Sequence, residues 1–219
     1  MEDTLSNRQY DKLDQAFSPG MKTNDVKDLY DRWSDTYDKD LQDIYFTPKH
    51  AARSLSESVT DKGARILDCG CGTGLVGEEL QKLGYHNIDG VDLSEKSLEI
   101  ARKKAVYKNL ICAALGPHPL EGASEDSYDA IVSSGCFVSE GHLNDSVLKE
   151  WTRIVKPGGY IVITVNARYV GLVEGDTYKT FISEKRVDLV RKQHMDRFTW
   201  DHTAQEYISG FVYTLKVLT

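Results

Sequence analysis

Five continuously apolar runs alternate with helical segments along most of this 219-residue chain. Uninterrupted apolar runs are typical of strands in a parallel sheet that helices cover on both faces. The predicted strands occupy residues 64–70, 87–94, 109–115, 128–135 and 160–167. The spacing of apolar residues predicts helices over 75–84, 95–105 and 143–159 between them. This alternation predicts an α/β chain with a doubly wound, Rossmann-like, mostly parallel sheet.

The C-terminal part departs from this alternation. A helix is expected over residues 177–192, followed by two strand-like runs at 195–200 and 206–218. Because the polar link between the two runs is short, they must pair antiparallel.

The N-terminal part divides near residue 24. Residues 1–24 are polar and contain a Ser-Pro-Gly break at 18–20, which predicts a mobile or helical leader outside the core. Residues 25–219 are expected to form a single domain that begins with two helices, the second over 48–59. The first helix carries one apolar stripe, and its members are Leu29, Trp33, Tyr37, Leu41 and Ile44.

Composition excludes several classes of partner and site. With 34 acidic and 27 basic residues, the net charge of -7 does not attract nucleic acid or anionic membranes. No apolar run has the length of a membrane span or a signal peptide, so a cytoplasmic protein is expected, with nuclear entry left open. The four cysteines lack metal-ligand spacing, so no metal site is predicted.

A glycine-rich loop joins the first predicted strand to the helix that follows it. Gly70, Gly72 and Gly74 would let the backbone turn sharply and let a ligand approach the main chain. In open α/β sheets the ligand crevice lies at the carboxyl ends of the strands, which is where this loop falls. The loop is therefore predicted to bind a ligand, and a tight turn without a ligand is the alternative.

Two acidic residues bear on the nature of this ligand. Residues 72–77 match the dinucleotide pattern G-x-G-x-x-G, and Asp92 follows at the distance of a ribose-binding acid. Asp68, however, ends the first strand beside the place where a pyrophosphate would lie. A carboxylate there repels phosphate and favours the ammonium and sulfonium of S-adenosylmethionine (SAM). SAM is therefore the predicted cofactor, and an NAD-dependent oxidoreductase is the less favoured reading.

The ends of the second and third strands offer contacts for the nucleoside. Asp92 is expected to accept hydrogen bonds from both ribose hydroxyls, although it could instead cap the helix that Ser94 begins. Leu93 is expected to pack on the adenine, with Leu115 and Gly116 at its face and edge.

Contacts for the methionine end and the acceptor are expected elsewhere. Ser133 and Ser134 follow the fourth strand and would line the methionine end. Tyr37, with Tyr30 on the same helix, could close over the methyl group as a lid, or could simply pack on the sheet. His142 is a candidate general base with a near-neutral pKa, or else a solvated loop residue.

These motifs together resemble the class I SAM-dependent methyltransferase family. The resemblance rests on D-x-G-x-G-x-G at 68–74, VDLS at 91–94, YDAIVSSG at 128–135 and a helix that ends in KPGG before a strand. The pattern Y-D-x-W-x-x-x-Y-D at 30–38 is similar to the methyltransferase-like group named after the Williams-Beuren syndrome region. The resemblance spans about residue 25 to the C-terminus. It implies a seven-stranded sheet with a reversed last strand, and conversion of SAM to S-adenosylhomocysteine.

One position departs from the family pattern. The family often places an acidic residue after the third strand, against the adenine amino group, whereas ICAALGPHPL contains no acidic residue before Glu121. A backbone or water contact would have to serve there instead.

The resemblance implies methyl transfer to an O, N, S or C nucleophile. Alignment and exclusion of water would supply most of the acceleration, so no strong base is required. The N-P-P-Y tetrapeptide of nitrogen methylation is absent after the fourth strand, where the chain has SSGC. A small-molecule acceptor is expected first and a protein side chain second, and a catalytically silent SAM-binding or partner-binding protein is the alternative. The sequence does not identify the acceptor or the oligomeric state.

Overall fold

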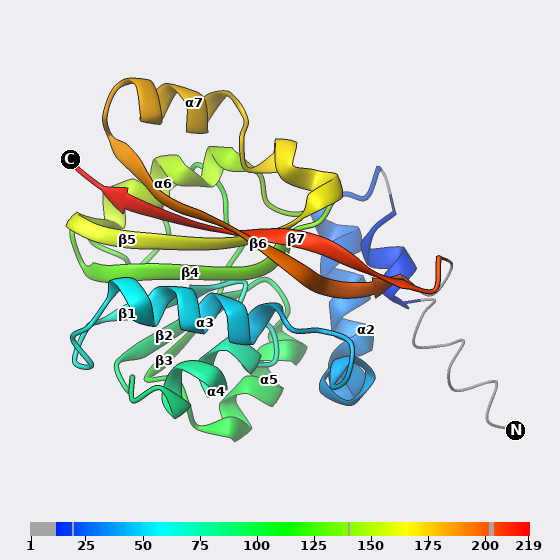
Figure 1. Ribbon diagram of the computed structural model, residues 1–219. Coiled ribbons are helices and arrows are strands. Elements are labelled where there is room, and N and C mark those ends of the chain that lie inside the picture. Colours follow the sequence, from blue (N-terminus) through cyan, green and yellow to red (C-terminus); the bar gives the residue numbers. More distant parts are fainter. Residues whose placement is uncertain (1–11, 19, 140, 202–203) are drawn as a thin grey trace, which may run out of the picture.

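One mixed sheet organises the computed structural model, which describes residues 12–18, 20–139, 141–201 and 204–219 (Figure 1). Within these residues the sheet has seven strands in the order β3-β2-β1-β4-β5-β7-β6. The strands are β1 Ile66–Cys69, β2 Ile88–Asp92, β3 Asn109–Cys112, β4 Tyr128–Phe137, β5 Val155–Asn166, β6 Val187–Asp201 and β7 Glu206–Val217. The sheet confirms the α/β fold class and the seven strands that the family resemblance implies.

Strand direction follows the doubly wound pattern. β1 pairs in parallel with β2 on one side and with β4 on the other. After β1 the chain adds β2 and β3 on one side, and it then crosses back to add β4 on the other side. β7 runs antiparallel to both β5 and β6, as expected for the last strand. The loop after β1 therefore lies at the topological switch point, where such sheets bind ligands.

Helices cover both faces of the sheet (Figure 1). One face carries α3 (Thr47–Ser58) and α4 (Leu75–Lys82), and the other carries α6 (Leu148–Ile154) and α7 (Asp176–Ser183). Neighbouring residues of β1 point to opposite faces, so Ile66 packs with the first pair of helices and Leu67 with the second. Both side chains are fully buried, which explains why successive positions of this strand can be apolar.

The helix predicted over 143–159 is shorter than expected. A 3-10 turn at Asp145–Val147 leads into α6, which ends at Ile154, and β5 already begins at Val155. A proline disfavours helical backbone at the residue before it, so Pro157 prevents the helix from continuing through Lys156. The KPGG segment is therefore the irregular start of a strand.

The helix predicted over 177–192 is wrong beyond its first half. α7 ends at Ser183, and Lys185 adopts a left-handed conformation with φ 55°. From Val187 onward the chain forms β6, which pairs with β7 over its length. Local helix propensity is overridden here because hydrogen bonding to β7 satisfies the backbone along the sheet edge.

The first helix of the domain, α2 (Thr23–Leu41), lies beyond the carboxyl ends of the parallel strands (Figure 1). Trp33 is buried in its apolar stripe, as expected of a core residue. Residues 12–16 are also helical, and Leu13 packs against Trp33 and Leu41. Excluding the leader from the core is therefore wrong for this short helix. Residues 1–11 lie outside the described residues.

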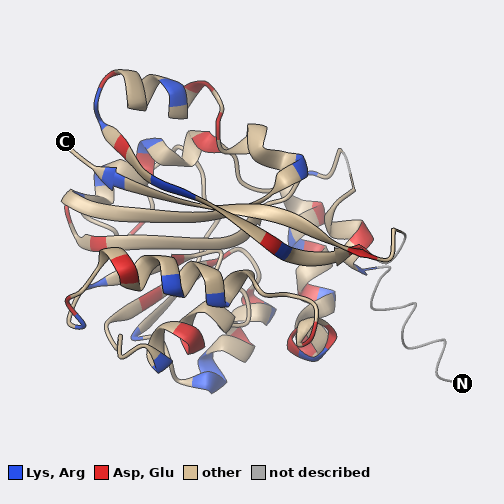
Figure 2. Cartoon of the chain, in the orientation of Figure 1, with Lys and Arg blue, Asp and Glu red and all other residues tan. Residues whose placement is uncertain are grey.

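Charged residues of both signs are interspersed over the helices (Figure 2). Several form exposed pairs one helical turn apart, such as Lys96 with Glu99 and Lys82 with Glu79. In the described part of the chain, no helix is long and apolar enough to cross a membrane. The same part contains no group of three His, Cys, Asp or Glu residues that could hold a metal ion.

A buried carboxylate ties together three strands of the sheet. Asp89 on β2 accepts hydrogen bonds from Arg65 Nη2 at 2.8 Å, Tyr128 Oη at 3.1 Å and Asn109 Nδ2 at 2.7 Å. Its side chain is only 3% exposed, so removing it leaves three donors without their acceptor.

The variant Asp89→Ala is expected to lower the free energy of unfolding by about 3 kcal/mol, the usual effect of breaking a buried charge network. Denaturant titration of the variant and the wild type measures this difference. Asp188→Ala, on the exposed face of β6, is the control and should change stability by less than about 0.5 kcal/mol. Equal effects of the two substitutions would contradict the structural role of Asp89.

Candidate functional site

A cavity of about 870 Å³ lies at the carboxyl ends of the strands, beside the switch point. The loops after β1, β2, β3 and β4 contribute to its wall, and α2 closes it. Among the residues predicted from sequence, those that line it are Tyr37, Gly70, Gly72, Asp92, Leu93, Leu115, Ser134 and His142.

The glycine loop has the backbone that the sequence predicts. Gly70, Gly72 and Gly74 have φ angles of 73°, 52° and 98°, which side-chain-bearing residues rarely adopt. A Cβ on Gly70 would also lie 2.2 Å from Cys136 Sγ, whereas a Cβ on Gly72 would meet nothing within 4 Å. Gly72 therefore presents open backbone to the cavity. Gly74 does not line the cavity and instead precedes α4 as its N-cap.

Asp92 connects the glycine loop to the turn after β2. Its Oδ2 accepts a hydrogen bond from Gly72 N–H at 2.8 Å, and its Oδ1 accepts one from Ser94 N–H at 2.8 Å. Burial raises the pKa of Asp92, and these backbone hydrogen bonds oppose the rise. A carboxylate has about four acceptor sites, and Asp92 lines the cavity, so a site that these backbone groups leave open can accept from a ligand.

The alternative role for Asp92, capping the next helix, belongs to its neighbour. Ser94 is the N-cap of α5 (Glu95–Lys104), and its Oγ accepts a hydrogen bond from Ser97 N–H at 3.0 Å. Asp92 therefore does not cap α5, and it faces both the glycine loop and the cavity.

Asp68 lies beneath the loop and does not line the cavity. It is fully buried, and its Oδ2 accepts a hydrogen bond from Tyr107 Oη at 2.6 Å. Burial raises the pKa of Asp68 to about 7, although the Tyr107 hydrogen bond opposes the rise. The carboxyl group is thus not held fully ionised at neutral pH. Its charge discriminates between SAM and a dinucleotide less strongly than the sequence argument assumes.

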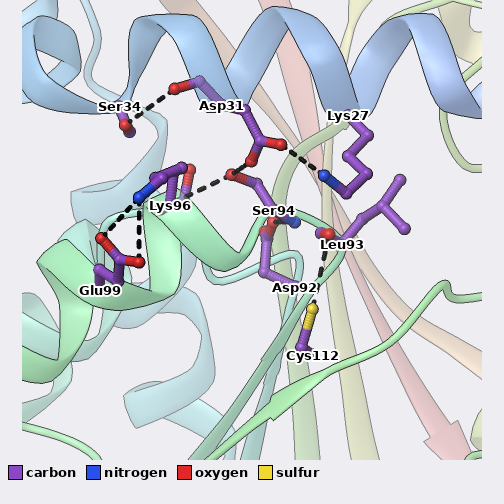
Figure 3. A network of polar contacts seen from close by, with 10 residues as sticks. Lys27, Asp31, Ser34, Asp92, Leu93, Ser94, Lys96, Glu99 and Cys112 are labelled. Atoms are coloured by element: carbon purple, nitrogen blue, oxygen red, sulfur yellow. Dashed lines mark hydrogen bonds and ion pairs between the residues drawn. The ribbon is translucent and has the colours of Figure 1, made fainter.

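Two acidic residues of α2 hydrogen-bond to the loops that line the cavity. Asp31 accepts a hydrogen bond from Ser94 Oγ at 2.6 Å and forms an ion pair with Lys27 (Figure 3). The middle of the tyrosine-bearing helix is thereby fixed to the turn that holds Asp92.

The second acidic residue is Asp38, which accepts a hydrogen bond from the hydroxyl of Thr73 in the glycine loop. Asp38 also pairs with Lys104 of α5 at 2.6 Å. Sequence reasoning used both acids only as part of a family pattern. Their separation of seven residues, which places Asp31 and Asp38 on one helical face, is the signal that could have identified them.

The loops after β3 and β4 complete the wall. Ala113, Ala114 and Leu115 line the cavity after β3, so this side is apolar and carries no acidic group. Gly116 lies outside the lining. After β4, Ser134 lines the cavity, whereas Ser133 is fully buried behind it.

His142 lines the cavity opposite Tyr30. Its Nδ1 is 2.7 Å from Ser139 Oγ, and its Nε2 is 3.4 Å from Tyr30 Oη. Burial lowers the pKa of His142 to about 4. The expected near-neutral pKa is therefore wrong, because the imidazole has lost solvent and, among the residues that the structure describes, has gained no acidic partner that would stabilise its charge.

The raised pKa of Asp68 makes stability depend on pH. An unfolded aspartate has a pKa of about 3.9, so between that value and about 7 the folded chain binds more protons. The stability contributed by Asp68 is therefore present at low pH and is lost as the pH rises through 7.

Asp68→Asn removes this titration and keeps the shape of the side chain. The free energy of unfolding of the variant minus that of the wild type should be about 3 kcal/mol larger at pH 8 than at pH 5. Denaturant unfolding of both proteins at the two pH values measures the difference. A relative stability that does not change with pH would show that Asp68 titrates normally.

Comparison with known proteins agrees with this geometry. Residues 66–159 match the family model described as a methyltransferase domain. Methyltransferase-like protein 27 of Homo sapiens is 36% identical over 139 residues, which is 62% of this chain and 56% of that protein. The ubiquinone biosynthesis O-methyltransferase of Aeromonas salmonicida is 31% identical over 147 residues, 61% of this chain and 60% of that protein. The chain thus spans less than two thirds of these curated relatives.

Solved structures share the fold at low sequence identity. A chain of the complex between the Haloferax volcanii Trm112 methyltransferase activator and a putative methyltransferase has a TM-score of 0.67. It is 19% identical, and the match covers 89% of this chain and 98% of that one. A TehB-like SAM-dependent methyltransferase from Corynebacterium glutamicum has a TM-score of 0.56 at 20% identity, covering 86% and 97%. The chain thus contains a methyltransferase domain at residues 66–159, and the solved structures share its fold.

Proposed function

We propose that this chain transfers a methyl group from SAM to a small-molecule acceptor, with S-adenosylhomocysteine as the product. The observation that carries the proposal is the cavity at the switch point, where Gly72 and Asp92 share one wall and α2 closes the other. We assign residues 25–219 to this domain. A cytoplasmic location stays a prediction from the sequence.

The lining residues suggest how SAM would lie. Asp92 is partly buried and lines the cavity, so its carboxylate is placed to accept charge-assisted hydrogen bonds from the ribose hydroxyls. Leu93 and Leu115 offer apolar surface for the two faces of the adenine. At the other end of the cavity, Gly70 and Ser134 are available to the methionine moiety. This arrangement points the sulfonium methyl group toward the tyrosines of α2.

The reaction proposed is an in-line displacement. A lone pair of the acceptor atom forms a bond to the methyl carbon while the carbon–sulfur bond breaks. The electron pair of that bond goes to sulfur, which becomes the neutral thioether of S-adenosylhomocysteine. Tyr30 and Tyr37 close the cavity, so they would exclude water and hold the acceptor near attack distance.

A proton must leave the acceptor when its nucleophilic atom carries one. His142 is the candidate to receive it, because the imidazole is neutral at pH 7 and lies beside Tyr30. A pKa of about 4 makes it a weak base, so we expect alignment to supply more of the rate than proton transfer. A nucleophile that is already deprotonated would need no base.

Two observations favour a small acceptor over a macromolecule. The net charge of -7 opposes polyanionic substrates, and α2 covers the cavity through its hydrogen bonds at Asp31 and Asp38. The curated relatives named as ubiquinone biosynthesis O-methyltransferases are also named for a small-molecule pathway. A protein side chain is the second candidate. It would have to enter a cavity that the helix closes.

A catalytically silent SAM-binding protein is the alternative from a different class. It would keep the contacts of Asp92 and bind S-adenosylhomocysteine without turnover. Incubation with methyl-labelled SAM and fractionated metabolite pools distinguishes the two, because only the enzyme moves the label to an acceptor. The absence of any labelled product, with cofactor binding intact, would favour the silent protein.

Asp92→Ala is expected to weaken binding of S-adenosylhomocysteine by about 2 to 3 kcal/mol, the loss of a charge-assisted pair of hydrogen bonds. Isothermal titration calorimetry measures the change, and thermal unfolding checks that the variant is folded. Asp188→Ala is the matched acidic control and should bind normally. NAD should give no heat with any of these proteins. Heat with NAD and none with S-adenosylhomocysteine would refute the proposed function.

A further inference from the structure

A second cavity of about 350 Å³ adjoins the first. Tyr30, Tyr37 and Gly135 line both cavities, so these residues form the boundary between them. The remaining residues that line the second cavity are Leu13, Ala16, Phe17, Trp33, Leu41, Tyr45, Val138, Phe198 and Thr199. The sequence assigns no ligand to this place, which exists because the helix at 12–16 packs between α2 and the end of β6.

No charged side chain lines this second cavity in the described part of the chain. Six of its lining residues are aromatic, and the indole N–H of Trp33 is already taken up by Asp40 at 2.8 Å. An ionised molecule would lose its hydration in such a cavity without gaining a partner of opposite charge. The lining therefore suits an uncharged, ring-shaped molecule.

Thr199 adds a polar position to the second cavity. Its side chain is almost fully buried, at 1% exposure, and its Oγ1 has no hydrogen-bond partner among the described residues. A buried hydroxyl that lacks a partner is unfavourable and is rare in proteins. A ligand that carries a hydroxyl group would satisfy it, because each hydroxyl can donate and accept.

The boundary residues place such a ligand next to the methyl donor. A Cβ on Gly135 would lie 1.9 Å from Tyr45 Oη, so only glycine fits at this position between the two cavities. Burial raises the pKa of Tyr45 to about 12 and raises that of Tyr37 as well, so both phenols stay neutral. Neutral hydroxyl groups at the boundary can orient an acceptor without adding charge.

We propose that the second cavity binds the methyl acceptor, and that the acceptor is an uncharged aromatic molecule carrying a hydroxyl group that pairs with Thr199. This inference rests on the proposed function and names the substrate class for it. The acceptor meets the cofactor at Tyr30 and Tyr37, which line both cavities.

Three small probes test the chemistry of this cavity. Phenol and toluene have nearly the same shape and differ in the hydroxyl group, and benzoate adds a negative charge. With the protein saturated with S-adenosylhomocysteine, ligand-observed NMR titration gives a dissociation constant for each. Phenol and toluene should bind, and benzoate should bind at least about tenfold more weakly because its charge would be desolvated without a partner.

Thr199→Val removes the hydroxyl and keeps the side-chain volume. It should weaken phenol binding about fivefold, the effect of one neutral hydrogen bond, and should leave toluene unchanged. A second variant, Ala16→Leu, fills the cavity and should weaken both probes. Neither residue lines the main cavity, so both variants should bind S-adenosylhomocysteine like the wild type.

The outcomes separate this inference from the proposed function. Normal binding of S-adenosylhomocysteine with no binding of phenol or toluene, or with equally tight benzoate, would overturn the substrate class alone. Equal loss of phenol and toluene in Thr199→Val would overturn the role of its hydroxyl. A wild-type protein that does not bind S-adenosylhomocysteine would overturn the proposed function and this inference with it.

Discussion

The hydrogen bonds that Asp92 accepts from two backbone segments hold the site together. One comes from Gly72 in the loop after β1 and the other from Ser94 in the turn after β2, each at 2.8 Å. The loops lie side by side because β1 and β2 are adjacent parallel strands, and parallel strands end at the same edge of a sheet. The carboxylate thus sets the distance between loops that a nucleoside must bridge. Asp92 also lines the cavity, so the side chain that joins the loops is the one proposed to bind the ribose.

The closure of the cavity by α2 follows from the same loops. Asp31 connects the helix to Ser94, which itself donates to Asp92, and Asp38 connects it to Thr73, which is next to Gly72. The side chains of Asp31 and Asp38 are 22% and 36% exposed, and partly exposed ion pairs of this kind contribute little stability each. These polar contacts therefore orient α2, whereas burial of its apolar stripe, which includes Trp33 at 1% exposure, contributes more to holding the helix in place.

Local patterns predicted the parts of this structure that depend on nearby residues. The apolar runs indicated the parallel strands, and the spacing of Gly70, Gly72 and Gly74 indicated the loop, because both follow from backbone requirements. Partners distant in sequence could not be found this way. Nothing near Asp68 in the sequence reveals that Tyr107 donates to it and that burial raises its pKa, or that Tyr30 meets His142 across 112 positions. The strand after Lys185 was missed for the same reason, since its conformation is set by pairing with β7.

A crystal structure of the protein with S-adenosylhomocysteine tests the account most directly, because it locates the ribose relative to Asp92. The account predicts that both ribose hydroxyls lie within hydrogen-bonding distance of the Asp92 carboxylate. It also predicts that Leu93 and Leu115 flank the adenine and that the sulfur faces Tyr30 and Tyr37. A ribose bound away from Asp92, or a nucleoside lying outside the cavity that α2 closes, would contradict it.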